Sequence, residues 1–158
     1  MDISVGSLYK YIRTKDNILW LVMDGIYGQL EDQLEAERTE ASGPTEALLH
    51  ALSRYLSAVD TVRRGILIMY REYKNLSPDA QTEFEERERR VINIFADIIK
   101  EGVNAGVFSC SHPDLASLDL LMAGHAWALK GWLLRQIPLE TYIARQCEVA
   151  RALVGVSD

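Results

Sequence analysis

The chain has 158 residues, of which 48% are hydrophobic and 25% are charged, and its formal net charge is −6. This mixture is typical of a globular domain with one core and excludes a disordered tail. Because the chain is acidic, it is a poor candidate for coating nucleic acid nonspecifically. No 18-residue stretch is free of charged side chains, so we expect no membrane span and no membrane partner.

The two cysteines, Cys110 and Cys147, cannot form a disulfide framework and lack metal-ligand spacing. We therefore expect a cytoplasmic protein with no metal and no cofactor. The N-terminus lacks the basic and then apolar pattern of a signal peptide. Because no segment shows a sustained period of two, the predicted fold class is all-α, a helical bundle.

Residues 1–15 carry three basic side chains and one acidic one, on an otherwise acidic chain. The segment reads Ile3-Ser4-Val5-Gly6-Ser7-Leu8-Tyr9-Lys10-Tyr11-Ile12, followed by Arg13-Thr14-Lys15. This pattern resembles the recognition helix and following turn of TetR-family transcriptional regulators. Phenol hydroxyls and an ammonium group can reach DNA phosphates and base edges, and the helix that Thr14 caps can hold a further phosphate. The DNA-binding residues that the resemblance implies are Ser7, Tyr9, Lys10, Tyr11, Thr14 and Lys15.

In these regulators two further helices precede the recognition helix, whereas this chain begins at the turn just before it. Leu8 and Ile12 would then lack their usual apolar partners, and a helix of about nine residues is marginal alone. We expect the chain as given to bind operator DNA weakly or not at all unless those helices are restored. A start codon assigned too far downstream, a truncated gene and a deliberately shortened product are the open explanations.

Apolar residues recur at every fourth position from Ile18 to Leu34, which predicts a connecting helix over residues 15–37 with Thr14 as its N-cap. The apolar segment 65–70 is expected to be short and to lie inside the bundle.

All four prolines precede helical patterns, and an acidic residue follows each within two positions, which suits the first turn of a helix. Pro44 is expected to begin a helix with a second apolar stripe. Another long helix is expected from Pro78 to about Ala105. Its charged run, residues 83–90, is interpreted as a solvated face with salt bridges.

The helix expected from Pro113 to about Arg135 has two apolar faces on opposite sides, and a last helix is expected from Leu139 to Val154. Since a surface helix needs only one apolar stripe, both faces must be covered. This helix is either the centre of a large bundle or part of a four-helix interface between two copies of the chain, and we predict the homodimer. The predicted interface residues are Leu118, Leu121, Met122, His125, Leu129, Trp132, Tyr142 and Val149.

The rest of the chain resembles the regulatory domain of the same family, and in particular a subgroup that responds to acyl-CoA thioesters in lipid or aromatic-acid catabolism. The segments that carry this resemblance are residues 69–78, 99–103, 132–135 and 139–143. The resemblance implies a small-molecule effector, an acyl-CoA or a similar lipophilic acid derivative.

A ligand pocket in such a bundle is expected between the central helices, with apolar and aromatic walls. The candidate ligand-binding residues are Tyr55, Met69, Tyr70, Arg71, Tyr73, Phe95 and Trp127. Arg71 or Lys130 is expected near an anionic group of the ligand. For each candidate, a place in the core or on the surface is the alternative interpretation.

No enzyme is predicted. The three histidines, His50, His112 and His125, fall on separate segments with no carboxylate and nucleophile around them. The sequence has no Gly-rich phosphate loop, His-Glu-x-x-His motif or Cys-x-x-Cys motif. We expect His125 to be a buried imidazole at the subunit interface, and a ligand contact or a pH-sensitive pair is the alternative.

These patterns together predict a one-component TetR-like transcriptional regulator, a ligand-responsive repressor of lipid or aromatic-acid catabolism genes. Residues 1–14 are predicted to be a remnant of the helix-turn-helix, and residues 15–158 the ligand-binding and dimerisation domain. The alternative is a helical small-molecule-binding or dimerisation protein that never touches DNA.

Overall fold

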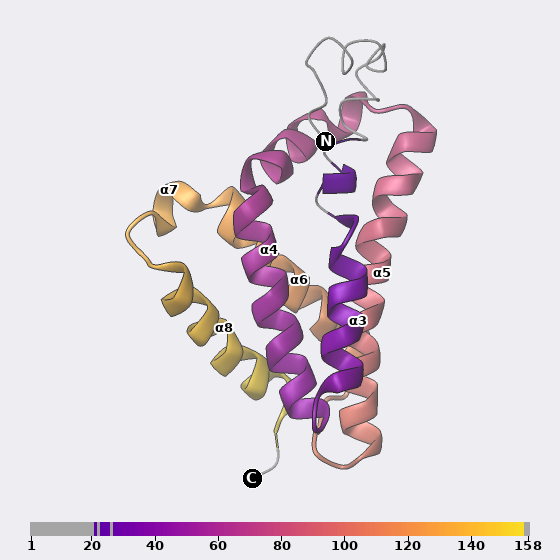
Figure 1. Cartoon of the computed structure of the whole chain (residues 1–158), viewed down its shortest axis with the longest axis vertical. Helices are drawn as coiled ribbons and strands as arrows, with labels where there is room; N and C mark the ends of the chain where they lie inside the picture. Colours follow the sequence, from indigo (N-terminus) through magenta and orange to yellow (C-terminus); the bar gives the residue numbers. More distant parts are fainter. Residues whose placement is uncertain (1–20, 22, 26, 157–158) are drawn as a thin grey trace, which may run out of the picture.

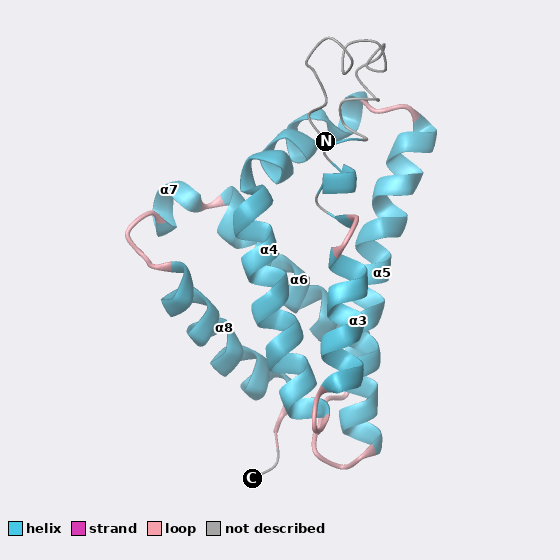
Figure 2. Ribbon diagram, in the orientation of Figure 1, coloured by secondary structure: helices cyan, strands magenta, loops and turns pink. Residues whose placement is uncertain are grey.

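The computed structural model of the chain describes residues 21, 23–25 and 27–156. These residues form helices and no strand, as predicted, and a single isolated bridge pairs Phe108 with Val156 (Figure 2). The labelled elements are α3 (Leu30–Glu40), α4 (Pro44–Glu72), the 3₁₀ turn η1 (Tyr73–Asn75), α5 (Pro78–Asn104), α6 (Pro113–Leu129), α7 (Gly131–Leu134) and α8 (Leu139–Val154). None of the helices in this part of the chain is long and apolar enough to cross a membrane.

The helices form a bundle around α4 (Figure 1). Helices α3, α4 and α5 lie side by side, and α6 packs against both α4 and α5. The short α7 turns the chain at the far end of α6, and α8 then runs obliquely back along α4. Helix α4 therefore contacts every other long helix of the described fold.

Prolines mark the helix starts, as the sequence predicts. Helices α4, α5 and α6 each begin at a proline, and Pro138 is the N-cap of α8. The side chain of Ser77 also caps α5 by accepting a hydrogen bond from the backbone of Ala80 at 3.4 Å. Helix α5 ends one residue before the predicted boundary.

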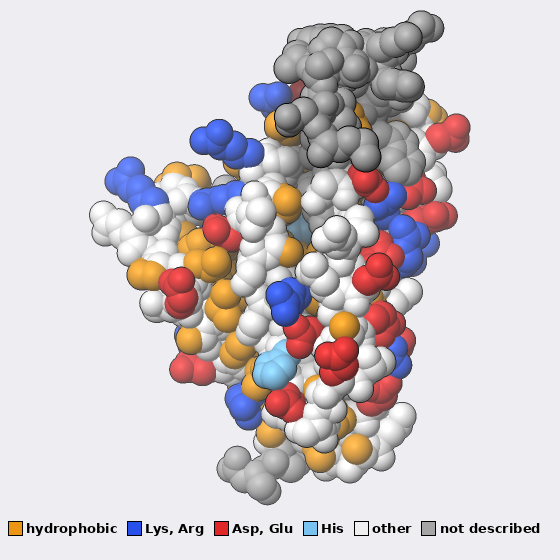
Figure 3. Space-filling model, in the orientation of Figure 1, with side chains coloured by type: hydrophobic (Ala, Val, Ile, Leu, Met, Phe, Trp, Pro, Cys, Tyr) orange, Lys and Arg blue, Asp and Glu red, His pale blue; other side chains and the backbone are white. Residues whose placement is uncertain are grey.

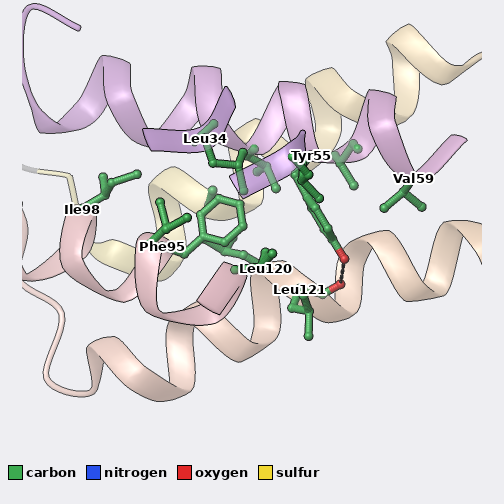
Figure 4. Close-up of a cluster of buried hydrophobic side chains, with 14 of the residues drawn as sticks. Leu34, Tyr55, Val59, Phe95, Ile98, Leu120 and Leu121 are labelled. Carbon is green, nitrogen blue, oxygen red and sulfur yellow. Dashed lines mark hydrogen bonds between the residues drawn. The ribbon is translucent and has the colours of Figure 1, made fainter. Parts of the chain in front are cut away.

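The core lies where α4, α5 and α6 meet, and Tyr55 is at its centre (Figure 4). The Tyr55 hydroxyl donates a hydrogen bond to the backbone oxygen of Leu121 at 2.9 Å. Its ring meets Phe95 edge-on, with centroids 5.8 Å apart. Gly124 leaves room for this ring, because a Cβ there would lie 2.6 Å from the Tyr55 hydroxyl oxygen.

Two predicted segments differ from the structure near α4. The connecting helix expected over residues 15–37 is interrupted by a turn at residues 28–29, and α3 extends beyond it to Glu40. The segment 65–70 is the last part of the 29-residue α4 rather than a separate buried helix. It therefore keeps one exposed side, which carries Leu67 and Ile68.

The helix predicted from Pro113 to Arg135 breaks at Lys130, between α6 and α7. Gly131, a poor helix former, follows the break. A Cβ at this position would lie 1.3 Å from a terminal nitrogen of Arg63, whose guanidinium stands 5.4 Å from the ring centroid of Trp127. A side chain at this position would displace the flexible end of Arg63, so Gly131 leaves room for the guanidinium beside Trp127.

Candidate ligand-binding site

A cavity of about 350 Å³ opens between the end of α4, η1 and the first half of α5. Aromatic and charged side chains converge on it, as in small-molecule sites. Its lining residues are Met69, Tyr70, Tyr73, Lys74, Phe84, Glu85 and Glu88. A larger hollow of about 470 Å³ lies between α3, α4 and the residues ahead of α3, but none of the described residues that line it is aromatic. We therefore place the candidate site in the aromatic cavity.

Phe84, on the aromatic wall of this cavity, packs against two tyrosine rings. Its ring centroid lies 5.7 Å from that of Tyr73 and 6.3 Å from that of Tyr27, on the residues ahead of α3. The Tyr73 hydroxyl also donates to the carboxylate of Glu85. The wall is thus held by contacts among three segments, α5, η1 and the residues before α3.

A chain of polar side chains crosses the bundle at the inner end of the cavity. The Tyr70 hydroxyl lies 2.5 Å from His125 Nδ1, and His125 Nε2 lies 3.4 Å from Glu88 Oε1. The Tyr27 hydroxyl donates to the same carboxylate oxygen at 3.4 Å. The four residues come from α4, α6, α5 and the segment ahead of α3, so this polar chain joins four parts of the fold.

The proton positions in this polar chain follow from its partners. A neutral imidazole has one donor and one acceptor nitrogen. Because the ionised Glu88 carboxylate can only accept, we assign the ring proton of His125 to Nε2, which faces it, and Nδ1 then accepts from the Tyr70 phenol. Glu88 then receives hydrogens from both His125 and Tyr27.

Burial controls the charges of the polar chain. It raises the pKa of the Glu88 carboxyl from its ordinary 4.5 to about 7, an effect that the hydrogen bond from Tyr27 partly opposes. It lowers the pKa of His125 from 6.5 to about 4. At neutral pH the imidazole is therefore uncharged, and Glu88 is close to its midpoint.

The structure brings together three of the predicted ligand-binding residues and separates the other four. Met69, Tyr70 and Tyr73 line the cavity. Arg71 points away into solvent, where it pairs with the adjacent Glu72 at 3.0 Å. The remaining three predicted residues, Tyr55, Phe95 and Trp127, are core side chains that do not line this cavity.

Trp127 is fixed by core contacts. Its indole nitrogen donates to Asp60 at 2.8 Å, and its ring stacks against Tyr142 with centroids 4.7 Å apart. The Tyr142 hydroxyl in turn donates to the backbone oxygen of Ala123 at 2.7 Å. This cluster ties α8 to α6 and α4.

The predicted dimer-interface residues fall into two groups. The structure buries Leu121, His125 and Tyr142 within the chain's own bundle, because α6 turns the first two inward and Tyr142 of α8 packs on Trp127. Leu129 is partly buried. The exposed group consists of Leu118, Met122, Trp132 and Val149. Leu115 and Leu133, which were not predicted, are also exposed.

The predicted DNA-binding residues lie outside the described residues. They are Ser7, Tyr9, Lys10, Tyr11, Thr14 and Lys15.

Glu88, the residue at the centre of the polar chain, is not among the predicted site residues, because the charged run 83–90 is typical of a solvated face. A signal was present: Glu88 follows Phe84 by four positions and precedes Val91 by three, so it lies on the apolar stripe of α5. A carboxylate at such a position faces the interior.

Residues 41–129 match the family model described as "Tetracyclin repressor-like, C-terminal domain". The chain belongs to this family, which confirms the resemblance seen in its sequence. The chain is also similar to the HTH-type transcriptional regulator HbdR of Aromatoleum sp. (strain CIB), with 28% identity over 130 residues. That match covers 82% of this chain but only 57% of HbdR.

Solved structures show the same fold. A bacterial regulatory protein in the tetR family from Rhodococcus RHA1 matches with a TM-score of 0.82 and 21% identity, over 99% of this chain and 83% of its own. The TetR-family regulator PfmR from Thermus thermophilus matches with a TM-score of 0.76 and 19% identity, over 99% of this chain and 84% of its own. AibR, solved with isovaleryl coenzyme A and operator DNA, matches with a TM-score of 0.73 and 15% identity, over 96% of this chain and 81% of its own.

Proposed function

We propose that this chain is the ligand-binding and dimerisation part of a one-component, cytoplasmic transcriptional repressor of TetR type. Its effector is an acyl-CoA or a similar lipophilic acid derivative, and its target genes serve lipid or aromatic-acid catabolism. No catalytic activity is proposed. The observation that carries the proposal is the aromatic cavity, whose lining includes Tyr70 and Glu88. These two residues contact His125 and Tyr27, which lie behind the lining.

The relatives support the effector class. AibR has been solved with an acyl-CoA and operator DNA, and HbdR is a helix-turn-helix transcriptional regulator. The cavity has apolar and aromatic walls for an acyl or aryl group, and Lys74 on its lining can meet an anionic group.

The polar chain supplies a route from the cavity to the N-terminal segment. A ligand that touches Tyr70 or Glu88 changes the partners of Tyr27, which lies on the segment leading back to residues 1–14. An effector shifts the equilibrium between conformations only by its difference in affinity for them. A coupling free energy of about 1–3 kcal/mol changes DNA affinity by roughly 5- to 150-fold.

The exposed apolar surface supports a homodimer. Trp132 on α7 and Leu133 beside it are exposed by 71% and 65%, and Leu118 and Met122 of α6 and Val149 of α8 add to this surface. Hydrophobic side chains also gather along the junction of α8 with α4 (Figure 3). Large exposed apolar patches mark interaction sites, and closed two-fold symmetry is the commonest way to cover one.

For DNA recognition we propose residues 1–14 as the recognition helix, with Tyr9, Lys10 and Tyr11 facing the groove and Ser7, Thr14 and Lys15 at the phosphates. The test is a mobility-shift assay on the DNA upstream of the chain's own gene. It compares the 158-residue chain with the same chain extended upstream in its reading frame by two helices.

The extended chain should bind this DNA, and isovaleryl-CoA or benzoyl-CoA should release it. Replacing Lys15 by alanine should weaken binding on all sequences, since a phosphate contact is lost, whereas a Glu148→Gln control on α8 should not. An extended chain that binds acyl-CoA but no DNA would support the alternative, a binding protein that does not act on genes. One that binds neither would contradict the proposal.

A further inference from the structure

We propose that the inner end of the cavity recognises a neutral hydroxyl group of the ligand, which donates a hydrogen bond to the Glu88 carboxylate. This inference rests on the proposed function, because it takes the cavity as the effector site. It narrows the effector to a hydroxylated lipophilic acid derivative.

The free acceptor is Glu88 Oε2. The contacts from Tyr27 and His125 both reach the other oxygen, Oε1. Within the described part of the chain, every buried side-chain oxygen has a hydrogen-bond partner. Since Glu88 Oε2 has none, this oxygen is not buried and is accessible to solvent. Glu88 lines the cavity and its side chain is 22% exposed. The cavity therefore gives a ligand access to a carboxylate oxygen that has spare lone pairs.

The two tyrosine hydroxyls on the cavity wall already donate hydrogen bonds to other side chains. Tyr70 donates to His125, and Tyr73 donates to Glu85. Each phenol oxygen can still accept, but neither can donate without breaking its present bond. When Glu88 is ionised, the described residues of the inner wall thus offer acceptors only, and their complement is a ligand group that donates.

The surroundings favour a neutral donor over a cationic one. Tyr27 and His125 at the inner end are uncharged at neutral pH, and burial raises the pKa of Glu88 to about 7. Moving an ammonium group to this depth would cost its hydration, whereas a hydroxyl loses much less. The lysine on the lining, Lys74, instead suits an anionic group at the opposite end of the ligand.

A matched series of small acids tests the inference by calorimetric titration of the 158-residue chain. The probes are 3-(4-hydroxyphenyl)propionate, its 4-methoxy and unsubstituted analogues, and its 4-aminomethyl analogue. At pH 8, where Glu88 is mostly ionised, the hydroxy probe should bind about tenfold more tightly than the methoxy and unsubstituted probes, since a hydrogen bond to a charged acceptor is lost in both. Equal affinities, tighter binding of the amine, or no binding of any probe would overturn the inference.

Two variants locate the hydrogen bond. Glu88→Met keeps the length of the side chain but removes the acceptor, so the preference for the hydroxy probe should disappear. Glu85→Gln changes a second carboxylate on the same cavity and should keep the preference. If Glu88→Met does not fold, Glu88→Gln, which retains a neutral acceptor, should show a reduced preference. A preference unchanged in the Glu88 variant would overturn the assignment.

The outcomes for the two proposals are distinct. If benzoyl-CoA binds the chain and the hydroxy probe has no advantage, the hydroxyl inference fails and the acyl-CoA regulator stands. If the hydroxy probe is preferred but neither it nor an acyl-CoA changes DNA binding, the proposed regulation fails and the site remains.

Discussion

Glu88 and His125 give the stability of the fold two opposite dependences on pH. Burial raises the pKa of Glu88 from 4.5 to about 7, so within this window the folded chain holds a proton that the unfolded chain has released. Its contribution to the free energy of unfolding therefore falls as the pH rises. Burial lowers the pKa of His125 from 6.5 to about 4, so the folded chain lacks a proton that the unfolded chain holds. This second contribution rises with pH.

Each contribution to the free energy of unfolding changes by about 1.4 kcal/mol per pH unit. Over the pH range between the unfolded and folded pKa values of the group, the change is about 2–3 kcal/mol. In the unaltered chain the two slopes largely cancel between about pH 4.5 and 6.5. The neighbouring phenols Tyr27 and Tyr70 stay protonated throughout, because burial raises the pKa of each. Relative to the unaltered chain, Glu88→Gln should gain about 2–3 kcal/mol of stability from pH 4.5 to 7, and His125→Gln should lose a similar amount from pH 4.5 to 6.5.

Urea unfolding followed by circular dichroism at several pH values between 4.5 and 7.5 measures these differences. Glu85→Gln, a more exposed carboxylate on the same helix, is the control and should follow the unaltered chain within about 0.5 kcal/mol. If the free energies of unfolding of both variants follow the unaltered chain at every pH, burial does not control the charges of Glu88 and His125.

Two further predictions concern packing and assembly. Gly124→Ala should lower the free energy of unfolding by about 1–3 kcal/mol, because the added Cβ would lie 2.5 Å from the Tyr55 ring. Urea unfolding measures this change. Gly25→Ala is the matched control, because its Cβ would meet nothing within 4 Å. Trp132→Ser combined with Met122→Ser should weaken self-association at least tenfold in sedimentation or native mass spectrometry, because about 2 kcal/mol or more of burial is lost at the exposed surface. An unaltered chain that is monomeric at micromolar concentration would contradict the dimer.

The helix starts could be predicted from the sequence because each depends on local chemistry. A proline followed by an acidic residue fits the first turn of a helix whatever the rest of the chain does. The break at Lys130 could not be predicted in the same way. It coincides with the approach of Arg63, 68 positions earlier, to the backbone of Gly131, and a local pattern holds no information about such a contact.

The cavity was predicted in part. Its aromatic residues at the end of α4 followed from an expected pocket between central helices, and Met69, Tyr70 and Tyr73 do line it. Glu88 was missed because its charged neighbours obscured the apolar stripe of α5. The two apolar faces of α6 were recognised, but residues of both faces turn toward the core, since periodicity alone does not fix how a helix is rotated in a bundle.

We propose that the cavity between α4 and α5 receives the effector against Glu88. A crystal structure of the chain with bound 3-(4-hydroxyphenyl)propionate would show where the ligand lies. We expect ligand density between Met69 and Phe84, with the phenol oxygen within hydrogen-bond distance of Glu88 Oε2 and the carboxylate toward Lys74. Density in the hollow between α3 and α4, or on the exposed surface of α6 and α7, with the aromatic cavity empty would contradict it.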